Sequence, residues 1–297
     1  MKWTLHRWVW QLQSPLFIGM PPSGALNRCR LYIPARVMWG AFTAEIARSR
    51  AQSNPDNIDE LYKAVGDDLK EKVRFSYLYP AEYTADRWLA WLPRYESGKG
   101  QSWRREDWNS TESIEIDRMF RSRILNVRPG TAIDPGTNSA ADGTLHETEC
   151  IQPYWCDGGK PLSSVAMAGY VFVKSGDPAL DEVMGLVTIF IGGDTRYGLG
   201  NLKQVDWGQT EKFFAMPVDL DHDDFPIVAG DRVLAHAVGT CRMKGALALL
   251  AGWDRLSGDR LVPVYREPLW VPGSACDNPG EQIKWAINAD GIWQEQH

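Results

Sequence analysis

The groups best suited to bind a ligand lie in a glycine-rich stretch in the second half of the chain. Its four glycines and two of the side chains between them are Gly192, Gly193, Gly198, Gly200, Arg196 and Tyr197. Glycine tolerates positive φ and lets a ligand approach the backbone closely, where N–H groups meet an anion. A capping glycine followed by a bulged turn would account for Gly192 alone, but not for the whole cluster. We therefore expect this loop to contact a phosphate backbone.

Two familiar nucleotide-binding loops do not fit this stretch. A Walker A loop needs the pattern GxxxxGK[ST], and neither Lys-Ser nor Lys-Thr follows Gly198 or Gly200. A Rossmann loop follows a strand and opens a helix. Here, apolar residues at helical spacing predict a helix before the loop, and residues 201–207 predict a strand after it. This order of elements disfavours a nucleotide cofactor, and we expect no cofactor.

The cysteines, histidines and acidic residues form no metal-binding pattern. The five cysteines are scattered without a CxxC pair, and the five histidines show no HExxH motif. The acidic run 219–224 lacks the glycine and the glutamate that a calcium loop requires. It is interpreted as a solvated acidic turn, with an electrostatic contact to a basic partner as the alternative. We expect no metal site.

The first eighty residues supply the elements that would position the glycine-rich loop. They predict a strand, two helices and a strand, over 3–13, 36–48, 58–72 and 73–79. Met38, Phe42 and Ile46 recur at steps of four, so one face of the first helix is expected to be buried. This β–α–α–β order is typical of an α+β fold.

A basic stretch followed by turn dipeptides predicts a long hairpin over 121–152. The stretch and the dipeptides are Arg118, Arg121, Arg123 and Arg128, then Pro129-Gly130, Pro135-Gly136 and Asp142-Gly143. Residues 144–152 alternate in polarity and predict the returning strand. A solvated surface loop is the alternative. The polar stretch 93–117 before the hairpin is expected to be an irregular insertion.

The second half of the chain is also predicted to mix strands and helices. Residues 165–173 predict a buried strand, and a helix is expected over 178–191, directly before the glycine loop. Further strands are predicted at 232–238 and 261–266, with a candidate helix over 243–252 between them. The predicted fold class is therefore α+β throughout.

Composition limits the classes of protein to consider. The chain has 297 residues, of which 44% are hydrophobic and 24% charged, as in soluble globular proteins of one or two domains. Its net charge of −6 argues against RNA or DNA binding by the chain alone, although a local basic patch inside an assembly stays open. The fourteen tryptophans predict a Trp-rich core, with a partner surface as the alternative. Without a long apolar run or a signal-peptide core at the start, we expect a cytoplasmic protein that does not enter a membrane.

Four segments together resemble the CRISPR-associated RAMP superfamily (repeat-associated mysterious proteins). They are SPLFIG, IPARVMWGAFTAEIAR, RPGTAIDPGTNSAADGTLHETECI and the loop IGGDTRYGLGNL, and they occur in the family's order across most of 3–207. The resemblance implies a ferredoxin-like (RRM-like) fold, in two such halves with a protruding hairpin. The implied domains are 1–160, with the hairpin at about 118–152, and 161–297, which carries the glycine loop.

The position of the glycine loop distinguishes between members of this family. Nearly one hundred residues follow Gly200, whereas the family's processing endonucleases carry the loop close to their C-terminus. The chain resembles more closely the type III effector subunit that holds the 5′ handle of the guide RNA and is non-catalytic. The repeating backbone subunit cuts target RNA through an Asp on an N-terminal loop, but no Asp occurs between Gly19 and Arg36. Asp134 in the hairpin is interpreted as a turn residue.

The resemblance assigns RNA contacts to particular residues of this sequence. Backbone contacts are expected at Gly192, Gly193, Arg196, Tyr197, Gly198, Gly200 and Arg36, and guide-steering contacts at Arg121, Arg123 and Arg128. Tyr197 is expected either to stack on a base or to pack in the core. Asp194 departs from the family pattern and would repel phosphate unless it pairs, with Arg196 as the nearest candidate.

The implied partners are the guide RNA and other CRISPR effector subunits, namely the backbone RAMP and the large polymerase-like subunit, in a hetero-oligomer. Two other functions stay open at this point. One is a RAMP endoribonuclease or backbone subunit that cuts target or precursor RNA. The other is a Trp-rich binding module for small molecules.

Overall fold

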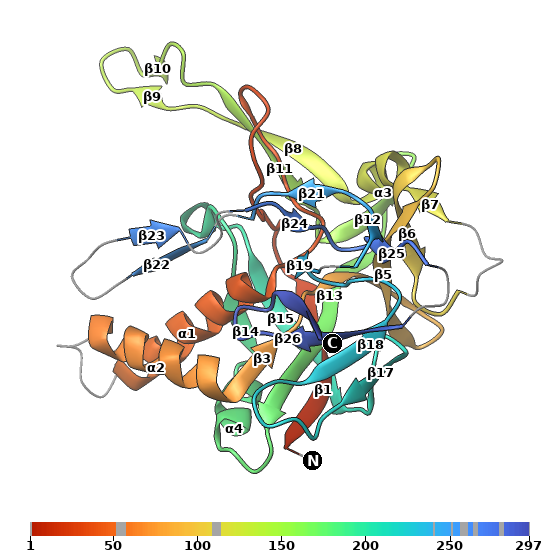
Figure 1. The fold of residues 1–297 in the computed structure, drawn as a ribbon. Helices are drawn as coiled ribbons and strands as arrows, with labels where there is room; N and C mark the ends of the chain where they lie inside the picture. Colours follow the sequence, from red (N-terminus) through yellow and green to blue (C-terminus); the bar gives the residue numbers. More distant parts are fainter. Residues whose placement is uncertain are drawn as a thin grey trace.

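The structure of the chain is a computed structural model that describes residues 2–51, 58–108, 114–239, 241–250, 252–255, 261–263, 267–278 and 282–296. It has an α+β fold in which strands predominate (Figure 1). No helix among these residues is long and apolar enough to cross a membrane.

A ten-stranded sheet forms the centre of the molecule. Its strands are β1 (Trp3–Leu12), β3 (Val73–Phe75), β4 (Tyr79–Thr84), β5 (Arg87–Glu96), β6 (Gly100–Arg105), β7 (Glu115–Ile116), β12 (Tyr154–Asp157), β13 (Lys160–Lys174), β14 (Thr188–Phe190) and β15 (Asn201–Gln209). They lie in the order β14-β15-β1-β13-β4-β5-β6-β7, with β3 and β12 also paired to β13. β1 is antiparallel to both of its neighbours, so that Trp8 lies opposite Gly169 on β13 and Trp207 on β15.

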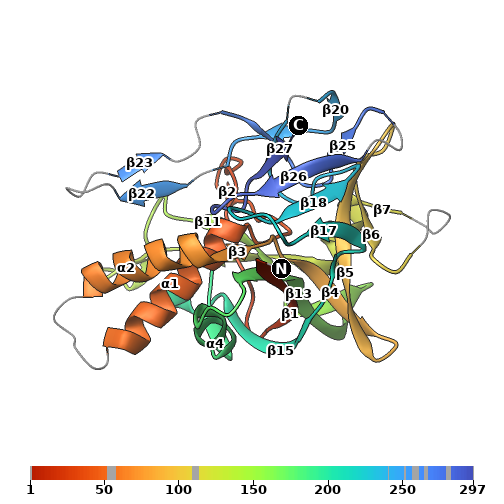
Figure 2. The same ribbon diagram turned by 60° about the horizontal axis from the view of Figure 1, so that its bottom comes forward.

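Two long helices cover one face of this sheet. They are α1 (Ala35–Ala51) and α2 (Ile58–Lys72), which lie side by side in both views (Figures 1 and 2). The predicted apolar face of α1 is confirmed, since Met38, Phe42 and Ile46 are all buried. Phe42 packs against Trp8 of β1 with ring centroids 5.3 Å apart. Large aromatic side chains therefore attach α1 firmly to the central strand.

A second sheet of eight strands packs on the opposite face. Its strands are β16 (Lys212–Phe213), β17 (Met216–Asp219), β18 (Ile227–Gly230), β26 (Ile283–Ile287), β27 (Trp293–Gln296), β19 (Ala237–Val238), β24 (Leu269–Trp270) and β21 (Leu247–Ala248), in this spatial order. Phe213 packs on Tyr170 of β13 at 4.8 Å. On β13, Gly169 lies opposite Trp8, whose side chain packs against α1. Because successive side chains of a strand point to opposite faces, Tyr170 points away from the helices and toward the second sheet.

Two small ribbons complete the C-terminal part, β20 (Met243–Lys244) with β25 (Ala275–Cys276) and β22 (Trp253–Arg255) with β23 (Leu261–Pro263). The helix expected over 243–252 is therefore wrong, and the strand expected over 232–238 is only two residues long. In the predicted strand 261–266, the last three residues lie outside the described part. From 210 onward, the described residues contain strands and no helix.

The protruding hairpin is shorter than predicted. It consists of β8 (Leu125–Gly130) and β11 (His146–Ile151), with β2 (Leu26–Asn27) parallel to β11 and a tip formed by β9 (Ile133–Asp134) and β10 (Ser139–Ala140). Figure 1 shows it projecting from the body at the upper left. The residues before it form helix α3 (Asp117–Ile124), because Phe120 and Ile124 lie one turn apart and are both buried. Arg118, Arg121 and Arg123 are therefore on a helix and not on the hairpin.

The expected insertion at 93–117 is also mostly regular structure. Residues up to Glu96 belong to β5, and β6 returns antiparallel to it. Trp103 on β6 is buried and stacks on Phe120 of α3 at 4.6 Å. Residues 109–113 lie outside the described part of the chain.

The helix predicted over 178–191 is much shorter in the structure. Helix α4 (Ala179–Met184) ends at Gly185, and Thr188–Phe190 forms β14, which pairs with β15. Glycine weakens a helix, and the β-branched residues Val187, Thr188 and Ile189 favour a strand once a partner is available. The glycine loop thus connects two antiparallel strands, a topology that still differs from a Rossmann loop.

Most of the tryptophans belong to the core, as predicted. Eight of the fourteen are buried, namely Trp3, Trp8, Trp10, Trp91, Trp103, Trp155, Trp285 and Trp293. The expected boundary between 1–160 and 161–297 falls at the start of β13, which pairs with β1 in the same sheet. The two domains stay a prediction.

Candidate nucleic-acid interface

The glycine loop is held against the segment that follows β1. Gly193 N–H donates to the carbonyl of Phe17 at 2.9 Å, and Gly200 N–H to that of Pro15 at 2.8 Å. A Cβ at Gly192 would lie 2.3 Å from the Phe17 oxygen, and one at Gly200 would lie 1.9 Å from the Ile191 oxygen. These glycines are required by close approach of two backbone segments, and the N–H groups of Gly193 and Gly200 are occupied.

The tip of the loop is the part that faces solvent. It contains the single-turn 3-10 helix η2 (Thr195–Tyr197), in which Gly198 N–H donates to the Thr195 carbonyl at 3.1 Å. Tyr197 is 82% exposed, so it is not a core tyrosine. Arg196 is also exposed, and within the described residues it forms no ion pair with Asp194. The loop therefore presents a cation and an aromatic ring next to each other.

A cleft of about 720 Å³ separates this loop from helix α1. The residues that line it include Arg30, Arg36, Gly40, Ala44, Arg48, Gly192, Gly193, Thr195 and Arg196. The cleft thus brings together the predicted residues Arg36, Gly192, Gly193 and Arg196. Its lining holds four arginines and one acidic residue, Glu45. Such a surface attracts a polyanion.

The sequence of α1 explains how its wall of the cleft forms. Arg36, Gly40, Ala44 and Arg48 recur at steps of four, so they share one helix face. The small residues in the middle leave room above the helix, and the arginines lie at its two ends. The first turn of α1 contains no acidic residue that would repel a phosphate. The Arg36 guanidinium lies 5.3 Å from the Trp39 ring centroid, which limits where it can point.

Two arginines of the cleft were missed by the sequence reasoning. Arg48 is on the same face as Arg36, and the spacing of four could have revealed it. Its side chain is 61% exposed and pairs with Glu45 at 2.7 Å. Arg30 is 7% exposed and is fixed by hydrogen bonds to the Tyr32 hydroxyl at 3.1 Å and the Leu249 carbonyl at 3.2 Å. No sequence pattern indicated Arg30, because its partner Leu249 lies more than two hundred residues away.

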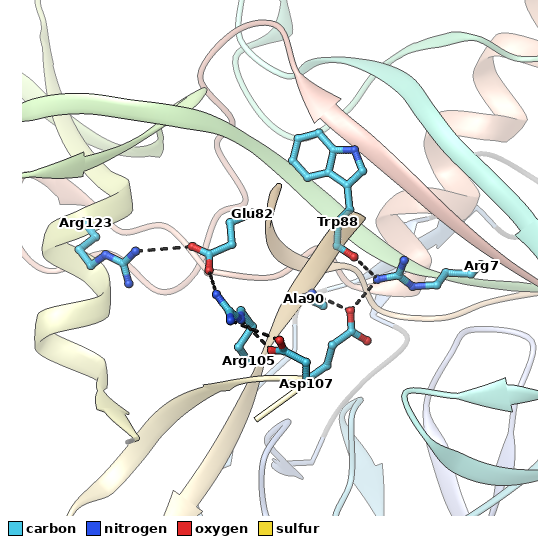
Figure 3. Close-up of polar contacts among 8 residues, drawn as sticks. Arg7, Glu82, Trp88, Ala90, Arg105, Asp107 and Arg123 are labelled. Carbon is cyan, nitrogen blue, oxygen red and sulfur yellow. Dashed lines mark hydrogen bonds and ion pairs between the residues drawn. The ribbon is translucent and has the colours of Figure 1, made fainter. Parts of the chain in front are cut away.

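The arginines assigned to guide steering are not brought together. Arg121 on α3 donates to the Cys29 carbonyl at 3.1 Å and lies 3.7 Å from Glu149. Arg123 pairs with Glu115 at 2.7 Å and, as Figure 3 shows, points toward Glu82 at 3.7 Å. Both side chains are engaged inside the fold. Arg128 is exposed on the hairpin, opposite Thr148.

The remaining polar signals have structural explanations. Asp134 accepts hydrogen bonds from Gly136 N–H at 2.8 Å and the Thr137 hydroxyl at 3.1 Å, as a turn residue does. In the acidic run, Asp219 accepts a bond from Asp221 N–H at 2.9 Å, and Asp223 pairs with Lys2. Among the described residues, no group of three or more His, Cys, Asp and Glu side chains could hold a metal ion.

Comparison with known proteins gives similarity to solved structures only. No family model and no curated protein matches the chain. One similar chain is from the cryo-EM structure of the Type III-B Cmr-beta bound to cognate target RNA, with 15% identity and a TM-score of 0.40 over 68% of this chain and 96% of that one. A chain from the cryo-EM structure of the Type III-B Cmr-beta apo state has 16% identity and a TM-score of 0.40, over 69% of this chain and 97% of that one. A chain from the Type III-B Cmr-beta structure with cognate target RNA and AMPPnP, state 1, has 12% identity and a TM-score of 0.48, over 91% of this chain and 85% of that one. Scores this low carry no argument about this chain.

Proposed function

We propose that this chain is a non-catalytic RNA-binding subunit of a type III-like CRISPR effector ribonucleoprotein and that it holds the 5′ handle of the guide RNA. The observation that carries the proposal is the cleft between α1 and the glycine loop. Two of the four RAMP-like segments, IPARVMWGAFTAEIAR and IGGDTRYGLGNL, form its two walls. Segments that resemble one family in sequence thus meet at one basic surface.

The strand order supports a ferredoxin-like core. Along the chain, β1, the helices α1 and α2, β3, β13, α4 and β15 form a β–α–β–β–α–β series. In space, the four strands lie in the order β15-β1-β13-β3, each antiparallel to its neighbours. With the other strands set aside as additions, this order is similar to the split βαβ arrangement of ferredoxin-like domains and supports the proposal. The described strands after 210 offer no such support for a second half, so the proposal rests on one core.

Arginine geometry favours recognition of the RNA backbone over recognition of base sequence. Guanidinium groups pair well with phosphate oxygens, and four of them line the cleft. Tyr197 follows Arg196 in the chain, and its exposed ring offers a surface on which a base stacks. Because the whole chain carries a charge of −6, neighbouring subunits supply the rest of the positive field, as expected for a member of a hetero-oligomer.

No residue of the chain is assigned a catalytic role in this proposal. Asp134, the acidic residue considered for cleavage, is held in its turn by two hydrogen bonds. The backbone RAMP and the large polymerase-like subunit remain the proposed protein partners.

The test is to co-express the chain with its genomic neighbours, purify the complex by this subunit and sequence the RNA that accompanies it. The double variant Arg36→Ala/Arg196→Ala is compared with Arg87→Ala, an exposed arginine outside the cleft. The proposal predicts guide RNAs with one common 5′ handle in the wild type and in Arg87→Ala, and trimmed or lost handles in the double variant. Purified protein without RNA, or intact handles in the double variant, would contradict it.

A further inference from the structure

A second cavity, of about 220 Å³, lies where the ends of β5 and β6 meet two loops of the C-terminal part. Its charged lining residues are Arg94, Arg104, Arg105, Arg232, Glu106 and Asp231. Phe214 and Leu234 supply an apolar wall. The cavity shares no lining residue with the cleft beside α1. It therefore constitutes a separate basic site.

Arg105 and Glu106 already have partners on or next to the first sheet, and Figure 3 shows Arg105 between Glu82 and Asp107. Arg105 donates to Asp107 through Nε at 2.7 Å and to Glu82 through Nη1 at 2.5 Å. Glu106 accepts from Arg7 at 2.6 Å and from Ala90 N–H at 2.8 Å. These two residues line the cavity, and each already pairs with an oppositely charged side chain.

Arg232 is different, because its positive charge is poorly compensated. Its side chain is only 18% exposed, and its nearest carboxylate oxygen, on the exposed Asp231, lies 3.5 Å away. Its Nη1 atom is buried and, among the described residues, has no hydrogen-bond partner. Burial and the neighbouring Arg94 charge both lower the pKa of Arg232. A mostly buried guanidinium whose nearest carboxylate is itself exposed carries a costly charge, so this position favours a bound anion.

Arg94 supplies a second cation at the same cavity. Its Nε atom pairs with Glu96 at 2.9 Å, which fixes the side chain against β5. The opposite wall is held in place by a turn in which Phe214 and Ala215 have φ values of 45° and 69°. Phe214 N–H donates to the Tyr170 hydroxyl at 3.0 Å. Both walls are thus positioned by contacts that do not use the cavity.

We propose that this cavity binds a phosphate group, held by the combined charge of Arg94 and Arg232. Phosphate fits the site because its oxygens accept from guanidinium groups and its charge compensates two close cations. The volume is below that of pockets for drug-sized ligands, which favours a small oxyanion. The phosphate is either a free ion or the terminal group of a nucleotide. Once bound, it links β5 of the first sheet to the loop that precedes β19.

Isothermal titration of the full-length chain with inorganic phosphate tests this inference. A second titration uses adenosine 5′-monophosphate, and a third uses acetate. We expect phosphate to bind the wild type, and binding to weaken at least about tenfold in Arg232→Met and in Arg94→Met. Tighter binding of the mononucleotide than of phosphate would assign the site to a nucleotide terminus, and the reverse to the free ion. Acetate binding as tight as phosphate binding would overturn the phosphate assignment.

Three controls separate this site from the RNA cleft and from loss of folding. Arg118→Met, an exposed arginine on α3, is expected to bind phosphate like the wild type. Arg196→Ala removes a cation of the cleft beside α1 only, so the phosphate binding that Arg232→Met weakens should persist in it. Loss of phosphate binding in Arg196→Ala with retention in Arg232→Met would place the ion in the cleft beside α1 and overturn the inference. Circular dichroism checks folding, and Arg94→Met provides the answer if Arg232→Met does not fold.

Discussion

At the residue scale, the two arginines predicted to contact the RNA backbone both line the cleft, whereas two of the three assigned to the hairpin do not lie on it. Arg36 and Arg196 were assigned because they stand in segments that resemble RAMP sequences. Arg121 and Arg123 were assigned to the hairpin with Arg128 because they form one basic stretch. Their partners Cys29, Glu149 and Glu82 are remote in sequence, so only the fold reveals that these side chains are engaged.

Arg196 is expected to act through phosphate contact. Arg196→Ala should lower the affinity of the full-length chain for single-stranded RNA and reduce the slope of log affinity against log salt by about 0.7. Fluorescence anisotropy over a series of salt concentrations measures both quantities. The matched control Arg87→Ala should keep the wild-type slope. An unchanged slope in Arg196→Ala would show that this side chain does not touch the RNA backbone.

His236 should make the protein sensitive to acid. Its ring is fully buried and bonds to the Tyr77 hydroxyl at 2.8 Å, and burial, with a smaller effect of the Arg30 charge, lowers its pKa to about 3. In the unfolded chain the pKa is about 6.5, so between these values the unfolded state binds the extra proton and stability falls as pH falls.

Urea unfolding of the wild type and of His236→Gln measures this effect. Between about pH 7 and about pH 5, the wild type should lose about 2 kcal/mol more of its free energy of unfolding than the variant. The other four histidines are common to both proteins, so their contribution cancels. Equal losses would mean that His236 titrates normally in the folded protein.

At the element scale, the long periodic segments were predictable and the short ones were not. The helices at 35–51 and 58–72 and the strands β1 and β13 follow directly from their apolar patterns. The helix pattern over 178–191 failed at Gly185, because Ile189 pairs with Leu202 of β15 in the sheet. That pairing depends on a strand located by tertiary structure, which local periodicity does not report.

The glycine loop is expected to depend on Gly200 more than on Gly198. Both have positive φ, of 74° and 83°, but only at Gly200 would a Cβ collide with backbone, at 1.9 Å from the Ile191 oxygen. Gly200→Ala should therefore lower the free energy of unfolding by about 2–4 kcal/mol, and Gly198→Ala by about 1 kcal/mol. Urea unfolding measures both. An equal loss of unfolding free energy in the two variants would show that close packing against Pro15 and Ile191 does not require glycine at position 200.

At the scale of the whole molecule, an acidic protein carries a local basic cleft. The charge of −6 argues against strong RNA binding by the whole surface, but it cannot locate the four arginines that line one groove. Their juxtaposition arises because the loop before β15 and the helix after β1 lie at the same end of two adjacent strands. Sequence resemblance identified both segments, and only the fold shows that they face each other.

The most direct test of the central proposal is to locate the RNA on the protein. A photoreactive uridine is placed in the 5′ handle of a guide RNA, the complete effector complex is assembled with this chain, and cross-linked peptides are identified by mass spectrometry. We predict cross-links within 190–200 and 35–48, the two walls of the cleft, with Tyr197 as the main site. Cross-links confined to the second sheet, at 212–296, or to other subunits alone would contradict the proposal.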